Sequence, residues 1–180
     1  MIADGSPAGR NQHETVPQLR VAPADSYSDA DPKPLAAYAA LTGAFAALIT
    51  LAEVTRRRRG LALPERISAG DLALLAVATY KLSRLVTKAR VTSFARAPFT
   101  RYTDEAGPSE VTEEPRGTGL RRAIGELAVC PYCVGEWIAA GLTVAYIRDP
   151  RSTRTAAGVL AVVAASDVLH QGWIALDKRS

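Results

Sequence analysis

The chain has 180 residues, a formal net charge of +4 and a sequence pI of about 9.3. Its mean hydropathy is +0.02, yet long apolar blocks alternate with arginine-rich loops, unlike the regular apolar spacing of a soluble helical protein. Aromatic residues make up only 6% and alanine dominates the apolar blocks, which suits closely packed membrane helices better than a bulky soluble core. The arginines are scattered and form no single patch, so we expect no nucleic acid partner.

The first 33 residues are polar and rich in Pro, Ser, Asp and Ala. Such a composition cannot bury enough apolar surface to offset the entropy of ordering, so residues 1–33 are predicted to be a disordered tail. No apolar stretch typical of a secretory signal peptide is evident within it.

The first apolar block, PLAAYAALTGAFAALITLA, occupies residues 34–52 and contains no charged residue. About 20 such residues span a bilayer core, so residues 34–54 are predicted to be the first transmembrane helix. The linker that follows, residues 55–70, begins with four arginines at 56–59. By the positive-inside rule, this basic run predicts that the adjacent end of the helix lies in the cytoplasm.

Residues 71–88, DLALLAVATYKLSRLVTK, are predicted to be a short helix that is apolar in its first half and amphipathic in its second. Lys81, Arg84 and Lys88 recur at i, i+3 and i+7 and form a basic stripe on one face. Two interpretations stay open. The helix lies in the interface with its stripe at anionic headgroups, or it spans the bilayer with Lys81 and Arg84 held against partners.

Residues 89–122 are predicted to be a polar loop. Its first part interleaves arginine with phenylalanine and tyrosine, which suits a segment lying against headgroups. Its second part, TDEAGPSEVTEEPRGTG, is acidic and rich in Gly and Pro, so we expect irregular structure there. No strand pattern is evident anywhere in the chain.

Residues 123–180 are predicted to form a helical pair, with apolar blocks at 131–147 and 155–176. The predicted fold class is therefore all-α, an integral membrane bundle of three or four hydrophobic helices with a disordered N-terminal tail. We expect a multi-pass protein of the cell membrane, with the lipid bilayer as its partner and a homo-oligomer as an open option.

The distribution of basic residues leaves the topology open. If all four apolar segments span, the basic run at 56–59 and the arginine-rich loop 89–122 lie on opposite sides. If residues 71–88 lie in the interface, both basic segments are cytoplasmic, and the cysteine pair sits near the cytoplasmic face.

The two cysteines, Cys130 and Cys133, form the sequence Cys-Pro-Tyr-Cys at the start of an apolar helix. A glutaredoxin-like fold is rejected because no β-strand is evident before the motif. One interpretation is a redox site, since a helix start lowers the pKa of a thiol. A second is a zinc site, which with only one such pair has to be shared across a dimer. The third is structural, with the two side chains packing or forming one local bridge.

Asp167 and His170 are spaced i, i+3 within the last apolar block. Ionisable groups inside a membrane are costly and often functional. They either pair with Lys81 or Arg84 and fix the bundle, which we favour, or relay protons in a small transporter.

The segments ATYKLSRLVTKARVTSFARAPFTRY and RGTGLRRAIGELAVCPYCVGEWIA, taken together, resemble the bacterial membrane proteins of the domain of unknown function 1360 family. The resemblance covers residues 70–176 and implies a small helical integral membrane protein of uncharacterised function, without a catalytic residue to assign. We therefore expect a structural or interaction role in the membrane, with no cofactor, and an enzyme is the less favoured class. The alternatives are a thiol-redox or metal-binding role of Cys130 and Cys133, and proton-coupled transport by Asp167 and His170.

Overall fold

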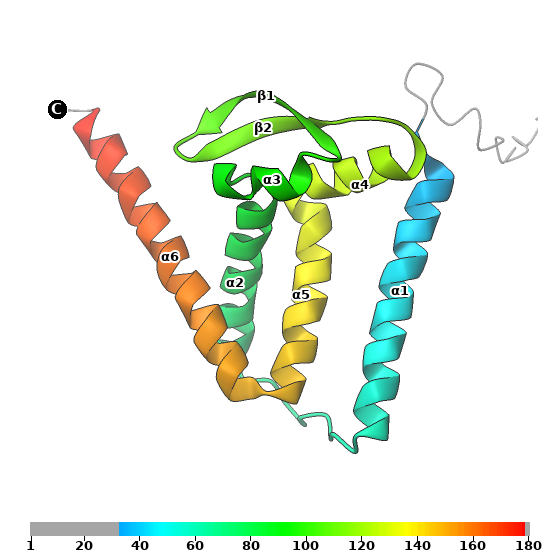
Figure 1. The fold of residues 1–180 in the computed structure, drawn as a ribbon. Helices are drawn as coiled ribbons and strands as arrows, with labels where there is room; N and C mark the ends of the chain where they lie inside the picture. The colour runs from blue at the N-terminus through cyan, green and yellow to red at the C-terminus, as the bar shows by residue number, and fades with distance from the viewer. Residues whose placement is uncertain (1–32, 179–180) are drawn as a thin grey trace, which may run out of the picture. The chain divides into compact units, whose positions relative to one another are not determined.

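The computed structural model describes residues 33–178. The disordered tail predicted for residues 1–33 lies outside the described residues, apart from Lys33. From residue 34 onwards the described chain is mostly helical and contains one small two-stranded sheet (Figure 1). The prediction of a mainly helical chain is confirmed, whereas the prediction of an all-α fold is wrong because of that sheet.

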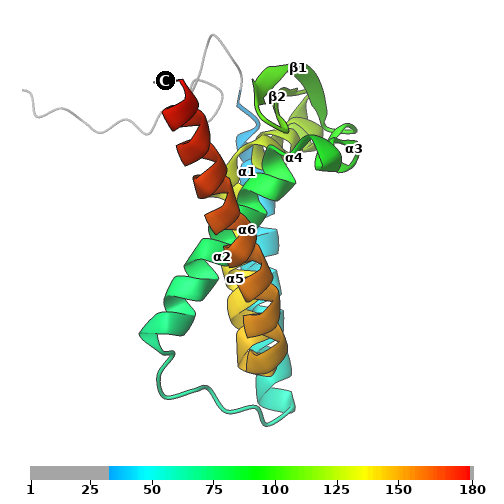
Figure 2. The ribbon, with the colours of Figure 1, turned by 90° about the vertical axis from the view of Figure 1, so that its left-hand side faces the viewer.

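Four helices form the long elements: α1 (Leu35–Arg58), α2 (Ala69–Thr87), α5 (Pro131–Arg148) and α6 (Pro150–Asp177). The shorter elements are the 3-10 turn η2 (Arg90–Thr92), α3 (Ser93–Arg96), β1 (Thr100–Gly107), β2 (Glu110–Pro115) and α4 (Gly119–Val129). Figures 1 and 2 show α3, α4 and the β1–β2 hairpin gathered where α2 ends and α5 begins, at the end opposite the α5–α6 turn.

Two helices, α1 and α6, are each long and apolar enough to cross a membrane. The pair α4 and α5 meets the same criteria only jointly, and it is bent by 82° at its junction, so it counts as one further span at most. This finding supports the apolar helices expected at residues 34–54 and 155–176. It does not confirm the predicted bundle of three or four spans.

Helix α1 continues to Arg58, beyond its predicted end at residue 54. The Glu53 carboxylate accepts hydrogen bonds from Arg56 and Arg57, at 2.7 and 2.6 Å. Such i, i+3 and i, i+4 pairs stabilise a helix, and cations in its last turn interact favourably with its dipole. The basic run is therefore the last turn of α1.

The core lies where α2 packs against both α5 and α6. Leu75 and Ala78 of α2 meet Tyr146 of α5 and Ala157 of α6 in one buried cluster. Ala78 and Ala157 are fully buried, and their small side chains let the helices approach closely. The helix predicted at residues 71–88 is thus present at Ala69–Thr87, with most of its contacts made to other helices.

The β1–β2 hairpin occupies the stretch for which irregular structure was expected. The strands pair antiparallel, with Thr100 opposite Pro115 and Gly107 opposite Glu110. The buried positions include Thr100 and Glu113 as well as Val111, so the apolar alternation that marks a half-buried strand is absent. The polar residues Thr100 and Glu113 are buried here beside a single apolar one, Val111, which is why the sequence pattern did not indicate a strand.

Helix α4 docks on the base of the hairpin through Gly125. A Cβ atom on Gly125 would lie 2.5 Å from the Phe99 carbonyl oxygen and 3.2 Å from Pro115. Arg121 of the same helix donates to the Pro98 carbonyl at 2.9 and 2.7 Å. The absence of a side chain at Gly125 therefore permits the close approach that fixes α4 against the hairpin.

Candidate functional site at the start of α5

The cysteine pair lies at the break between α4 and α5. Pro131 occupies the first helical position of α5, where a missing N–H is tolerated. Proline also restricts the preceding residue to extended geometry, and Cys130 has φ −99° and ψ 104°. The local sequence thus ends one helix and begins the next at a sharp angle.

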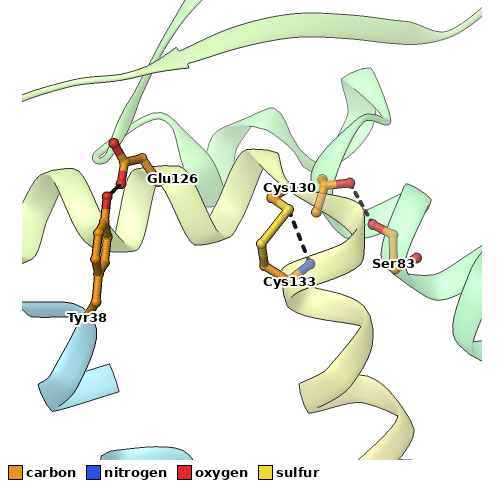
Figure 3. The surroundings of a disulfide bond; sticks show 6 residues. Tyr38, Ser83, Glu126, Cys130 and Cys133 are labelled. Carbon is orange, nitrogen blue, oxygen red and sulfur yellow. Dashed lines mark hydrogen bonds between the residues drawn. A yellow bond between two sulfur atoms is a disulfide. The ribbon is translucent and has the colours of Figure 1, made fainter. Parts of the chain in front are cut away.

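Cys130 and Cys133 are joined by a disulfide, with their Cα atoms 5.3 Å apart (Figure 3). The Cys133 backbone N–H donates to the Cys130 sulfur at 3.2 Å, which caps the start of α5. Cys133 is exposed and Cys130 is half-buried. A local bridge, which is part of the third interpretation of this motif, is therefore present, and Cys133 is its exposed member.

The zinc interpretation gains no support from the described residues. Within residues 33–178, no group of three or more His, Cys, Asp or Glu side chains is arranged to hold a metal ion. A site shared across a dimer stays a prediction.

A pocket of about 420 Å³ adjoins the disulfide between α1, α4 and α5. Its wall includes Cys133 together with apolar and aromatic side chains and two carboxylates, among them Leu41, Phe45, Glu126, Glu136 and Trp137. Phe45 of α1 meets Trp137 of α5 edge to face, with ring centroids 5.0 Å apart. The pocket thus combines a sulfur atom, apolar walls and acidic groups.

Glu126 is held in this pocket by two neighbours. Its carboxylate accepts a hydrogen bond from the Tyr38 hydroxyl of α1, as Figure 3 shows, and Arg122 Nε lies 3.1 Å from its other oxygen. Because Tyr38 and Glu126 come from different helices, this contact ties α1 to α4.

A second groove, of about 550 Å³, runs between α2 and α5. Leu72, Leu75 and Ala139 are among its apolar lining residues, while Arg84 and Glu136 also contribute to its wall. Glu136 therefore borders both cavities.

A buried ion pair that no local sequence pattern indicates joins α3 to β2. Arg96 donates to both carboxylate oxygens of Glu113 at 2.9 Å, and the two side chains are only 3% and 4% exposed. Arg96 also donates to the Val86 carbonyl at 2.6 Å, and the Thr100 hydroxyl donates to Glu113 at 2.8 Å. Burial opposes ionisation of Glu113, but the hydrogen bonds from Arg96 and Thr100 outweigh it and hold the pKa of this carboxyl below its usual value.

A second polar cluster, also missed from the sequence, joins the other ends of α2, α5 and α6. The Asp71 carboxylate accepts two hydrogen bonds from Arg154, at 2.7 and 2.8 Å, and one from the Tyr146 hydroxyl at 2.7 Å. The Ser68 hydroxyl also donates to Asp71, at 2.8 Å, and the Arg154 guanidinium lies 5.3 Å from the centre of the Tyr146 ring. We call these residues the three-helix cluster: Asp71, Tyr146 and Arg154.

The predicted basic stripe of α2 meets partners within the chain. Lys81 forms an ion pair with Asp167 of α6, one of the two pairings that the sequence allowed. Arg84 forms an ion pair with Glu110 of the hairpin. Lys88 is the C-cap of α2, and its backbone carbonyl accepts a hydrogen bond from the Val111 N–H at 2.9 Å. Contact of this stripe with headgroups stays a prediction.

The second member of the predicted polar pair, His170, lies apart from these contacts. It is exposed on the last part of α6, beyond Asp167, whose own side chain is 53% exposed. The structure thus brings Asp167 to Lys81 and leaves His170 on the surface of the helix.

Comparison with known proteins gives one family and two curated relatives. A family model described as "Protein of unknown function (DUF1360)" matches residues 74–173. "UPF0713 protein YngL" of Bacillus subtilis (strain 168) is 27% identical over 109 residues, which cover 59% of this chain and 80% of YngL. "Sporulation protein YjcA" of the same organism is 28% identical over 102 residues, which cover 55% of this chain and 86% of YjcA. No solved structure matches.

Proposed function

The chain belongs to the DUF1360 family, and on this premise we propose a multi-pass membrane protein with a structural or interaction role. In this proposal α1, α2, α5 and α6 cross the bilayer, while the hairpin and α4 form a polar cap on one membrane face. The observation that carries the proposal is the exposure of large apolar side chains along the long helices.

Exposed apolar surface is extensive on the two longest helices. Helix α1 has no buried residue, and Leu48 and Leu51 on it are more than half exposed. Val162 and Leu169 of α6 are 71% and 74% exposed. Contiguous apolar surface of this kind is costly in water and marks contact with a membrane or a partner. Lipid tails covering these helices would remove that cost.

The orientation follows from the basic run and the disulfide. Residues 57–59 are exposed arginines directly after an apolar helix, which favours a cytoplasmic location of this end. The start of α5, with the disulfide, lies at the opposite end of the helices in Figures 1 and 2. Disulfides persist outside the cytoplasm, so both features favour a cap on the outer face, against the arginines of residues 89–122, which the positive-inside rule alone would place in the cytoplasm.

Accessibility labelling in intact cells tests this topology. In a Cys130→Ser/Cys133→Ser background, Asp104→Cys places one thiol on the hairpin, and Ser152→Cys places one at the α5–α6 turn. A membrane-impermeant maleimide is expected to label the first variant in intact cells and the second only after lysis. Labelling of both variants from the same side would contradict a four-span arrangement.

A second candidate function is thiol–disulfide exchange, favoured by the position of the Cys130–Cys133 bridge. Cys133, the exposed member of the bridge, would be the cysteine that a substrate thiolate attacks. The thiol released at Cys130 would receive the Cys133 N–H at the start of α5, which stabilises a thiolate leaving group. Exchange would transfer the disulfide to a secreted protein that carries two thiols. Cys130 and Cys133 would then both be reduced thiols.

Two variants test this candidate against the structural role. Cys130→Ser and Cys133→Ser each remove exchange completely while leaving a side chain of similar size. If the chain acts in exchange, either variant abolishes its cellular phenotype. If both variants retain that phenotype in full, exchange is rejected and the structural role stands.

A further inference from the structure

The pocket beside Cys133 raises the question of what reoxidises the cysteine pair after exchange. We infer that the reduced pair passes two electrons to a membrane-soluble quinone, which binds as a substrate in the pocket between α1, α4 and α5. This inference rests on the second candidate function and names its electron acceptor.

The chemistry of the pocket walls points to this class of substrate. Leu41, Phe45 and Trp137 provide an apolar and aromatic surface, and the volume of about 420 Å³ lies in the range of about 300–1,000 Å³ that is usual for small-molecule sites. Helix α1, which forms one wall, has no buried residue and carries no charge between residues 35 and 52, so a lipid-soluble molecule can reach the pocket from the bilayer. A polar oxidant such as glutathione disulfide gains nothing from such walls.

An acidic group in the wall matches the proton demand of the reaction. Reduction of a quinone to a hydroquinone takes up two protons at the ring oxygens. Glu136 borders the pocket and is exposed, so it can pass protons from water to the ring oxygens, whereas Glu126 is held as a carboxylate by Arg122. A thiol pair, an apolar wall and an exposed acidic side chain that can relay protons from water are thus placed around one cavity.

The two sulfur atoms have different roles in the transfer. Cys133 lines the pocket, so its thiolate adds to a ring carbon of the quinone and forms a C–S bond. The Cys130 thiolate, stabilised at the start of α5, then attacks the Cys133 sulfur. The S–S bond forms, the C–S bond breaks with its electron pair moving onto the ring, and two protons complete the hydroquinone. Two thiols are oxidised, and one quinone is reduced.

The test uses the purified full-length chain in detergent micelles, reduced with dithiothreitol and desalted without oxygen. A quinone with a short alkyl tail is added, its ultraviolet absorbance is followed, and the remaining thiols are counted with a maleimide. We expect one quinone to be consumed for every two thiols lost. In a parallel reaction, oxidised glutathione replaces the quinone. It oxidises the thiol pair by thiol–disulfide exchange and does not need to bind in the pocket.

Pocket variants separate the quinone site from the cysteine pair. Leu41→Trp fills the cavity and is expected to slow quinone reduction by about tenfold or more, because the ring is displaced from Cys133. Its oxidation by oxidised glutathione is expected to be unchanged. The matched control is Leu48→Trp, which adds the same side chain at a 54% exposed position of α1 outside the pocket lining and should alter neither reaction.

The outcomes distinguish the inference from the function on which it rests. If oxidised glutathione restores the disulfide but the quinone does not, or if Leu41→Trp reacts with quinone as fast as the unchanged chain, the quinone site is wrong and exchange survives. If neither oxidant restores the disulfide, both proposals fail. Should Leu41→Trp lose both reactions through misfolding, the isosteric Glu136→Gln decides: slower quinone reduction alone supports the site, and an unchanged rate overturns it.

Discussion

The two polar clusters at opposite ends of α2 are built differently. Arg96 and Glu113 are almost fully buried, and every partner of this pair lies between residues 86 and 113. The three-helix cluster instead joins Asp71 to Tyr146 and Arg154, which are far away in sequence, and the Arg154 side chain remains 48% exposed. One cluster closes a local unit, and the other connects distant helices.

This difference separates two tasks in the fold. The Arg96 cluster holds the hairpin to the end of α2. Arg96 donates hydrogen bonds to the Val86 and Ala89 carbonyls, so it helps to satisfy the backbone polar groups where α2 ends. The three-helix cluster supplies directional hydrogen bonds between α2, α5 and α6. Apolar contacts alone are not directional and would allow these helices to pack in several ways. In a bilayer, where lipid is as apolar as the helices, such polar contacts help to select one arrangement.

The largest effect is expected from Arg96→Ala. Removing one partner of a buried ion pair leaves the other charge buried and unpaired, which typically costs about 3–5 kcal/mol. The free energy of unfolding in detergent micelles measures this loss, and proteolysis of the hairpin reports where it occurs.

Arg101→Ala is the matched control for Arg96→Ala. Arg101 pairs with Glu114 on the same hairpin, but the two side chains are 73% and 60% exposed, so little stability should be lost. Equal losses in the two variants would show that burial of the Arg96 pair has no energetic role.

Gly125→Ala comes next and tests how α4 is attached to the hairpin end. The added methyl group would overlap the Phe99 carbonyl, and overpacking of this kind costs about 1–3 kcal/mol. Gly141→Ala adds the same group to α5, where nothing lies within 4 Å, so it should be neutral or slightly stabilising. A neutral Gly125→Ala would mean that α4 is not closely seated.

Asp71→Asn probes the three-helix cluster and is expected to cost less than Arg96→Ala. The variant keeps the size of the side chain but removes its charge, and the half-exposed Arg154 can recover part of its solvation. Tyr146→Phe, which removes a single hydroxyl donor, should have a smaller effect. Unfolding titrations of the two variants and of their combination give the coupling energy, and strictly additive losses would argue against one connected cluster.

Features carried by local sequence could be predicted. The long apolar blocks at 34–54 and 155–176 indicated α1 and α6, and the spacing of Cys130 and Cys133 allowed a local bridge. The pairing of Lys81 with Asp167 was also anticipated, because an acid within an apolar helix requires a cation.

Features that depend on tertiary contact could not be predicted. Arg96 and Glu113 belong to residue types that are rarely buried, so nothing in their local sequence marked them as core positions. Asp71 and Arg154 are 83 residues apart, so no local spacing connects them. The hairpin was missed for the same reason, since its buried Glu113 is stabilised by hydrogen bonds from Arg96 of α3 and from Thr100, which the local sequence does not reveal.

The smallest effect is expected from Asp167→Asn, which also decides between two roles for the Lys81–Asp167 pair. Polar contacts between membrane helices average about 0.6 kcal/mol, and the Asp167 side chain is half exposed, so stability should change little. If the pair only connects α2 to α6, the cellular phenotype survives both this variant and His170→Ala. Proton-coupled transport would instead be lost completely in Asp167→Asn, although the protein would remain folded and inserted. Comparing phenotype with stability in Asp167→Asn therefore distinguishes a helix contact from a proton site, because only a proton site fails without unfolding.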